Sequence, residues 1–158
     1  MASSKSRKAS PETRARTFSE FASSILLIVL LWLVAELVFL PLAAESFTGE
    51  VAKRVTSLVA VLFVIAVATL LPQTMRKGGQ AVELLSRSFV RSRYPKERQT
   101  KMLPVFEDMG WALLVAILGI IISSLVYWIN AVFGGMTLFV TIVAVSIPLF
   151  QAASSWPH

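Results

Sequence analysis

Four apolar stretches, each about twenty residues long and nearly free of charge, constrain the fold more than any other feature of this sequence. They cover residues 21–42, 55–73, 109–130 and 136–154. At a helical rise of 1.5 Å per residue, about twenty residues match the ~30 Å hydrocarbon core of a bilayer. Only 15% of the 158 residues are charged, whereas a soluble domain usually carries about a quarter. The sequence therefore predicts an all-α, polytopic membrane protein with four transmembrane helices in a single bundle over residues 21–158.

The segments outside these stretches are polar and differ in length. Residues 1–20 are basic and rich in serine, without an apolar period, and predict a disordered tail that becomes helical towards Phe18. Residues 74–108 form the one long polar loop, which begins soon after Pro72 and contains Gly78 and Gly79. Between the last two spans only five residues remain, and Gly134 and Gly135 within them predict a tight turn with positive φ.

The distribution of lysine and arginine predicts the orientation. The tail carries five such residues and the 74–108 loop eight, whereas the 43–54 loop carries two and the last turn none. Basic residues concentrate on the cytoplasmic side of membrane proteins. The tail and the long loop together carry thirteen lysines and arginines, against two in the other connections, which favours cytoplasmic N- and C-termini.

The long loop shows the pattern of an amphipathic cytoplasmic helix between spans two and three. Val82, Leu85 and Phe89 share a helical face. Basic residues lie before and after this stripe in the sequence, which favours a helix lying on the anionic inner leaflet. The alternative is a helix packed against a partner subunit. The basic residues expected at the lipid surface are Arg87, Arg91, Arg93, Lys96, Arg98 and Lys101.

Glu36 is the ionisable residue deep inside a span, at roughly 7 Å outward of the bilayer centre. Intramembrane acids are rare and usually face a bundle interior or water. One interpretation is therefore an ion or proton ligand on a pathway. The other is a structural partner for Arg54 or Lys53 at the start of span two, and a protonated carboxyl is a third option.

Hydroxyl side chains lie at about the depth of Glu36 in the other spans. If they face inward, they form a polar layer with it, although such hydroxyls often only bond to helix backbones. The candidate pathway or ion-binding residues are Glu36, Ser57, Ser123, Ser124, Thr137 and Thr141.

Small residues in span three predict close helix packing. Ala112, Ala116, Gly119 and Ser123 follow one another at intervals of three or four residues, a spacing that lets helix backbones approach. We expect this stripe to pack within the chain.

Several function classes find no support in the sequence. The chain has no cysteine, and its one histidine is the terminal His158, a poor axial ligand for a membrane haem. It contains no phosphate loop, metal-spaced acids or Ser/His pairing, so we expect no enzyme activity, cofactor or metal site. The basic charge flanks the spans without interleaved aromatic residues, which argues against nucleic-acid binding.

Four short helices that contain about one buried acid between them leave little room for a substrate pathway within a single copy of the chain. The favoured hypothesis is therefore a homo-oligomeric ion channel or transport protein with Glu36 near its conduction path. The alternative is a non-conducting accessory or assembly subunit of a larger membrane complex, with the basic loop docking to other subunits.

Overall fold

The computed structural model describes residues 11–157, and every regular element in that part of the chain is a helix. The first helical stretch is continuous and consists of α1 (Pro11–Val34), a π-helical segment η1 (Ala35–Phe39) and α2 (Leu40–Ser46). Phe47 and Thr48 connect it to α3. The remaining helices are α3 (Gly49–Arg93), α4 (Lys96–Ile129) and α5 (Ala131–Ser154).

The prediction of four membrane-spanning helices is confirmed at the level of length and composition. The stretch Pro11–Ser46 and the helices α3, α4 and α5 are each long and apolar enough to cross a bilayer. Their outward faces carry large apolar side chains, for example Leu37 at 72% and Phe150 at 76% exposure. In a membrane these faces meet lipid rather than water, as expected of a multi-pass membrane protein.

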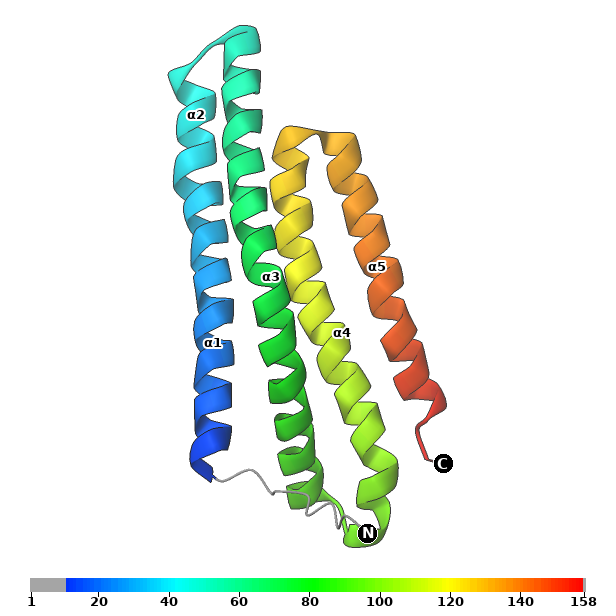
Figure 1. The fold of residues 1–158 in the computed structure, drawn as a ribbon. Coiled ribbons are helices and arrows are strands. Elements are labelled where there is room, and N and C mark those ends of the chain that lie inside the picture. Colours follow the sequence, from blue (N-terminus) through cyan, green and yellow to red (C-terminus); the bar gives the residue numbers. More distant parts are fainter. Residues whose placement is uncertain (1–10, 158) are drawn as a thin grey trace, which may run out of the picture.

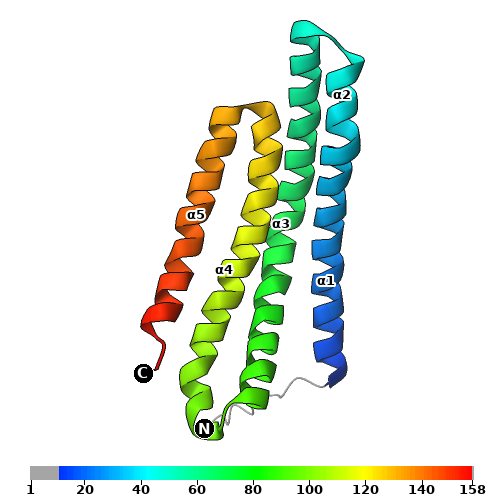
Figure 2. The same ribbon diagram turned by 180° about the vertical axis from the view of Figure 1, so that it is seen from behind.

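The helices form an open layer. They lie side by side in the order α1, α3, α4 and α5 (Figures 1 and 2), α5 packs almost wholly on α4, and α1 meets α4 at few positions. Short connections explain this order, because each places consecutive helices next to each other in antiparallel directions. The buried core therefore lies between the α1–α2 stretch, α3 and α4, with α5 outside it.

The basic tail is helical from Pro11 onward, earlier than the helical start towards Phe18 that we expected. Proline suits the first helical turn, and Glu12 in that turn favours the N-terminal end of the helix dipole. Arg16 and Glu20 then form an exposed pair one turn apart, at 3.2 Å. Residues 1–10 and His158 lie outside the described residues.

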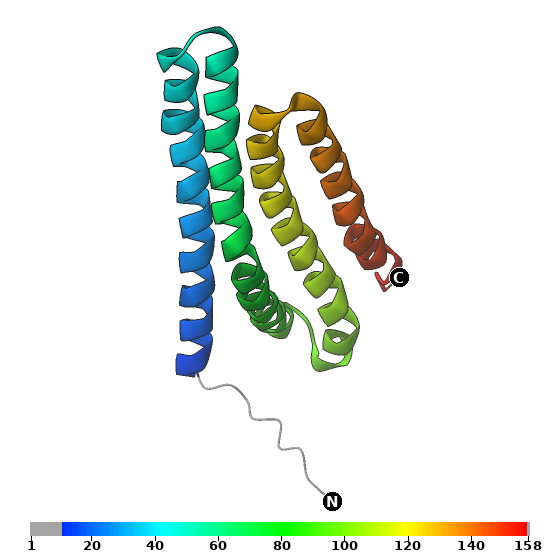
Figure 3. The same cartoon turned by 45° about the horizontal axis from the view of Figure 1, so that its top comes forward.

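The prediction of a separate amphipathic helix in the long loop is wrong. Residues 74–93 continue α3 without a break, and Pro72 lies inside this helix, which changes direction along its length (Figure 3). Gly78 lies inside α3, and a Cβ there would lie 2.6 Å from Leu114 Cδ2. The glycine serves close packing of α4 on α3, and this tertiary contact overrides its low helix propensity.

The three side chains of the expected apolar stripe differ in how far they are buried. Val82 is buried, whereas Leu85 and Phe89 are about half exposed. Phe89 meets Phe106 of α4 at a ring-centroid distance of 4.9 Å. The stripe therefore belongs partly to a helical hairpin of α3 and α4, which turns at Tyr94 and Pro95.

The α4–α5 turn also differs from the prediction, because Gly134 and Gly135 are helical and neither has positive φ. The turn lies at Asn130, whose extended backbone ends α4 and whose side chain accepts a hydrogen bond from Val132 N at 2.9 Å. A Cβ on Gly134 would lie 2.6 Å from the Cα of Tyr127. Glycine is needed here for the close approach of two helices.

Candidate functional site

Glu36 lies in the π-helical turn η1, at the second position of a segment that runs from Ala35 to Phe39. The wider turn is closed by the backbone N–H of Leu40, which donates to the carbonyl of Ala35 five residues earlier. Such turns are rare and occur frequently at functional sites. The side chain of Glu36 is half-buried and faces α4.

Two side chains of α4 donate hydrogen bonds to the Glu36 carboxylate, one to each oxygen. The Ser124 hydroxyl donates to Oε1, and the Trp128 indole N–H donates to Oε2 at 2.8 Å. Ser124 and Trp128 are four residues apart, so they stand on one face of α4. This arrangement joins the first helical stretch to α4 across the core.

The alternative interpretation paired Glu36 with Arg54, but among the described residues Arg54 has a different partner. Arg54 lies 3.8 Å from Glu50, one turn earlier in α3, and both side chains are more than 80% exposed. Helix α3 begins at Gly49 rather than near residue 55, which places Arg54 in its second turn beside Glu50. The Glu36 side chain meanwhile points to α4.

Trp128 is the residue of this site that the sequence analysis missed. As an aromatic residue near the end of a span it fits an interfacial position, and that interpretation hides its donor role. The available signal was its spacing from Ser124, because the two residues present a hydroxyl and an indole N–H on one face.

The other candidate hydroxyls lie in different surroundings. Ser123 donates to the carbonyl of Gly119 at 2.6 Å, while Thr137 and Thr141 donate to the carbonyls of Phe133 and Thr137, both at 2.8 Å. These bonds stay within single helices. The structure therefore joins Ser124 to Glu36, whereas Ser123, Thr137 and Thr141 bond to their own backbones.

The small-residue stripe packs within the chain, as expected. Ala112 and Ser123 are buried. A Cβ on Gly119 would collide with the side chain of Thr141 in α5. This close approach joins α5 to the rest of the layer.

A pocket of about 340 Å³ lies beside Trp128, toward the end of the molecule where α2 meets α3. Ser57, Thr56 and Lys53 supply its polar groups, and Ala44, Ala52 and Ile129 supply apolar ones. Ser57 is thus placed near the indole that bonds to Glu36.

A second tryptophan adds an unsatisfied polar group near Glu36. The indole N–H of Trp32 is buried without a hydrogen-bond partner among the described residues. Trp32 precedes Glu36 by four residues, about one helical turn. Buried donors nearly always find acceptors, so the exception marks this part of the core as unusual.

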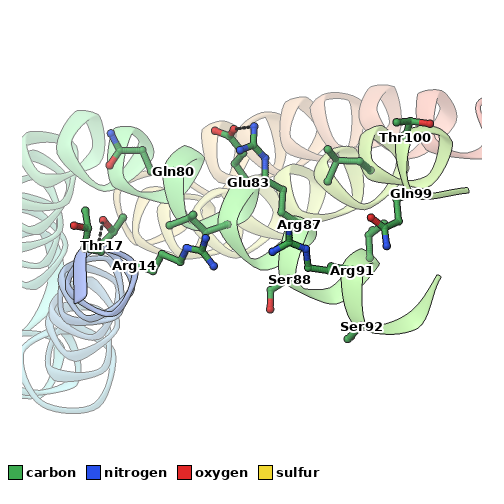
Figure 4. A pocket seen from close by; sticks show the side chains of 14 residues that line it. Arg14, Thr17, Gln80, Glu83, Arg87, Ser88, Arg91, Ser92, Gln99 and Thr100 are labelled. Atoms are coloured by element: carbon green, nitrogen blue, oxygen red, sulfur yellow. Dashed lines mark hydrogen bonds and ion pairs between the residues drawn. The ribbon is translucent and has the colours of Figure 1, made fainter. Parts of the chain in front are cut away.

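At the opposite end of the layer, which we call the basic end, a larger groove opens between α1, α3 and α4 (Figure 4). Its volume is about 1050 Å³. Arg14 and Arg91 reach into it from opposite sides, while Arg87 forms a 2.5 Å ion pair with Glu83. The groove lining is Thr13, Arg14, Thr17, Gln80, Glu83, Leu84, Arg87, Ser88, Val90, Arg91, Ser92, Gln99, Thr100 and Leu103.

Glu107 stands near this groove with a raised carboxyl pKa. Burial contributes most to the rise, and the charges of Glu83 and Asp108 add to it, while the Arg87 charge opposes it. The ionised form of Glu107 is therefore disfavoured in the folded chain.

The expected lipid-surface residues are all exposed at the basic end. Arg87, Arg91 and Arg93 belong to the last turns of α3, and Lys96, Arg98 and Lys101 to the first turns of α4. The Arg93 guanidinium also lies 5.8 Å from the ring centroid of Phe89.

Within residues 11–157, no three acidic, histidine or cysteine side chains gather as metal ligands would. No model of a protein family, curated protein or solved structure matches this chain.

Proposed function

We propose that the protein is a subunit of a homo-oligomeric channel or transport protein, with Glu36 at the ion- or proton-handling position. The observation that carries this proposal is an ionisable side chain on a π-helical turn in the apolar part of a span. An acid at such a depth costs about 2–3 kcal/mol on insertion scales and usually marks a pathway.

The hydrogen bonds to Glu36 are compatible with this role. Ser124 and Trp128 each donate to one carboxylate oxygen, and each oxygen can accept more than one hydrogen bond. The carboxylate therefore keeps acceptor capacity for a cation or a proton carrier. The unsatisfied indole N–H of Trp32 places a further polar group one turn away.

The open layer explains why the proposal requires several copies. A single copy does not surround Glu36 with helices, because α5 packs on α4 and stays outside the shared core. Copies that meet along their helix faces would enclose a pathway that one copy leaves open.

In this proposal the basic end faces the cytoplasm, so the exposed Lys and Arg side chains lie beside the anionic inner leaflet. The chain has no cysteine, which makes labelling direct. We expect single Ser46→Cys and Ser88→Cys variants to react with an impermeant maleimide from opposite sides of the membrane. Reaction of both from one side would contradict the orientation.

Flux through proteoliposomes tests the role of Glu36. Glu36→Gln keeps the size of the side chain and removes its charge, so cation or proton flux should change at least tenfold while the protein remains folded. Glu45→Gln is the matched control, because Glu45 is exposed in α2. Equal flux in both variants and the parent protein would refute the proposal.

The second candidate is a non-conducting accessory or assembly subunit, and one observation favours it. The α3–α4 hairpin extends beyond the spans as a packed helical unit, with Val90, Met102 and Val105 buried inside it. Such a unit offers a rigid docking element. Purification as a single copy together with other membrane subunits, without flux on reconstitution, would favour this function.

A further inference from the structure

The groove at the basic end has the composition of an anion-binding site. Three arginines and one glutamate line it, which gives a net charge of +2. The one glutamate, Glu83, is already paired with Arg87. Among the described residues, Arg14 and Arg91 have no carboxylate partner.

The polar groups of the groove suit a phosphate group in particular. An arginine guanidinium presents several N–H donors in a planar fork that matches two phosphate oxygens. The hydroxyls of Ser88 and Thr100 and the amide of Gln80 line the same groove, whereas the Thr17 hydroxyl already donates to the carbonyl of Thr13. Donors of this kind complete the coordination of a phosphate that two arginines hold.

Apolar side chains also line the groove. Leu84 and Leu103 are partly exposed there. A small inorganic anion gains nothing from such a surface, whereas a ligand with a carbon skeleton buries part of it.

The position of the groove fits a membrane lipid. Counting from Phe21, where the first apolar stretch begins, Thr17 is about 6 Å and Arg14 about 10 Å further along α1. The headgroup layer extends roughly 5–8 Å beyond the hydrocarbon core on each side. The opening of the groove therefore lies at or just beyond the level of lipid phosphates.

We propose that this groove binds the phosphate of an anionic lipid headgroup, with Arg14 of α1 and Arg91 of α3 as its principal contacts. Binding there would join the start of α1 to the α3–α4 hairpin, because the two arginines approach from different helices (Figure 4). The site is distinct from Glu36 and does not depend on the proposed transport function.

The test uses the purified full-length chain in a nonionic detergent. Soluble short-chain phosphatidylglycerol is titrated while the melting temperature is recorded, with short-chain phosphatidylcholine and inorganic pyrophosphate as parallel arms. We expect a saturable rise with phosphatidylglycerol and a weaker response to phosphatidylcholine. The Arg14→Gln/Arg91→Gln variant should weaken the apparent affinity at least about tenfold, since two charge-assisted contacts are lost.

The matched control separates a site from general attraction to a basic surface. Arg76→Gln/Lys77→Gln removes the same charge from residues of α3 that do not line the groove, and it should leave the affinity within about twofold. If the double groove variant does not fold, the two single variants carry the test, and Arg91→Lys should fall between Arg91→Gln and the parent.

The arms also identify the source of the phosphate. Saturable binding of phosphatidylglycerol that depends on Arg14 and Arg91 supports the lipid site. Binding of pyrophosphate alone, with the same dependence, refutes the lipid assignment and identifies a soluble phosphate ligand. Absence of saturable binding in every arm, or equal losses in the groove and control variants, refutes the site.

Discussion

Replacing Trp128 by phenylalanine tests the interaction that holds Glu36 in place. The substitution keeps an aromatic ring but removes the N–H that donates to Glu36 Oε2 at 2.8 Å. A hydrogen bond to a charged group contributes about 1.5–3 kcal/mol in water-soluble proteins, and interhelical hydrogen bonds in membranes reach about 1.7. We therefore expect a loss of about 1.5 kcal/mol of unfolding free energy beyond the change in ring size.

Trp32→Phe supplies the matched control for ring size. Both tryptophans are half-buried and pack against the same core, but the Trp32 N–H has no acceptor among the described residues. Its removal relieves an unsatisfied donor rather than breaking a bond. Trp128→Phe should therefore cost clearly more stability than Trp32→Phe.

Double-mutant cycles show which residue is coupled to the carboxylate. Glu36→Met combined with Trp128→Phe should give a coupling energy of about 1–1.5 kcal/mol. Glu36→Met combined with Arg54→Gln should give a coupling near zero, since Arg54 lies beside Glu50.

The assay is reversible unfolding by dodecyl sulfate in mixed micelles, followed by far-ultraviolet circular dichroism so that tryptophan loss does not disturb the signal. Equal costs for the two tryptophan variants, or a larger coupling with Arg54 than with Trp128, would refute the geometry described for Glu36.

Two further predictions concern the helix hairpins. Gly134→Ala should lower thermal stability, with an overpacking cost of about 1–3 kcal/mol, because its Cβ would meet the Tyr127 backbone. Gly135→Ala should be neutral or stabilising, since nothing lies within 4 Å of that Cβ; equal effects at both glycines would restore the turn interpretation. Glu107→Gln should raise the free energy of unfolding near pH 7, because the parent carboxyl is ionised there at a cost. This gain should shrink as the pH falls through the raised pKa toward 4.5, where the parent carboxyl also becomes neutral. A gain that does not change with pH would contradict a titrating Glu107.

The spans could be predicted from the sequence because they depend on local composition. A run of about twenty apolar residues must satisfy its backbone internally in a membrane, and a helix does so without any partner. The ends of the helices could not be predicted in the same way. Pro72, Gly78 and Gly134 are helix-breaking signals by propensity, yet each lies inside a helix.

The candidate site was only partly predictable for a similar reason. Glu36 stands out as a charged residue in an apolar stretch, which is a local signal. Its partner Trp128 is 92 residues away in the sequence, and only the packing of the first helical stretch on α4 brings them together. The Arg54 hypothesis relied on nearness to a span boundary, and the earlier start of α3 placed that arginine elsewhere.

The two candidate sites lie far apart on one continuous helical stretch. Arg14 and Glu36 are 22 residues apart, which corresponds to about 33 Å along the helix axis. Their effects should therefore be separable: substitutions in the groove should change lipid affinity without changing flux, and Glu36→Gln should do the reverse. If groove variants also changed flux, the stretch from Pro11 to Ser46 would be the direct route of coupling, because it carries both residues and packs on α3 between them.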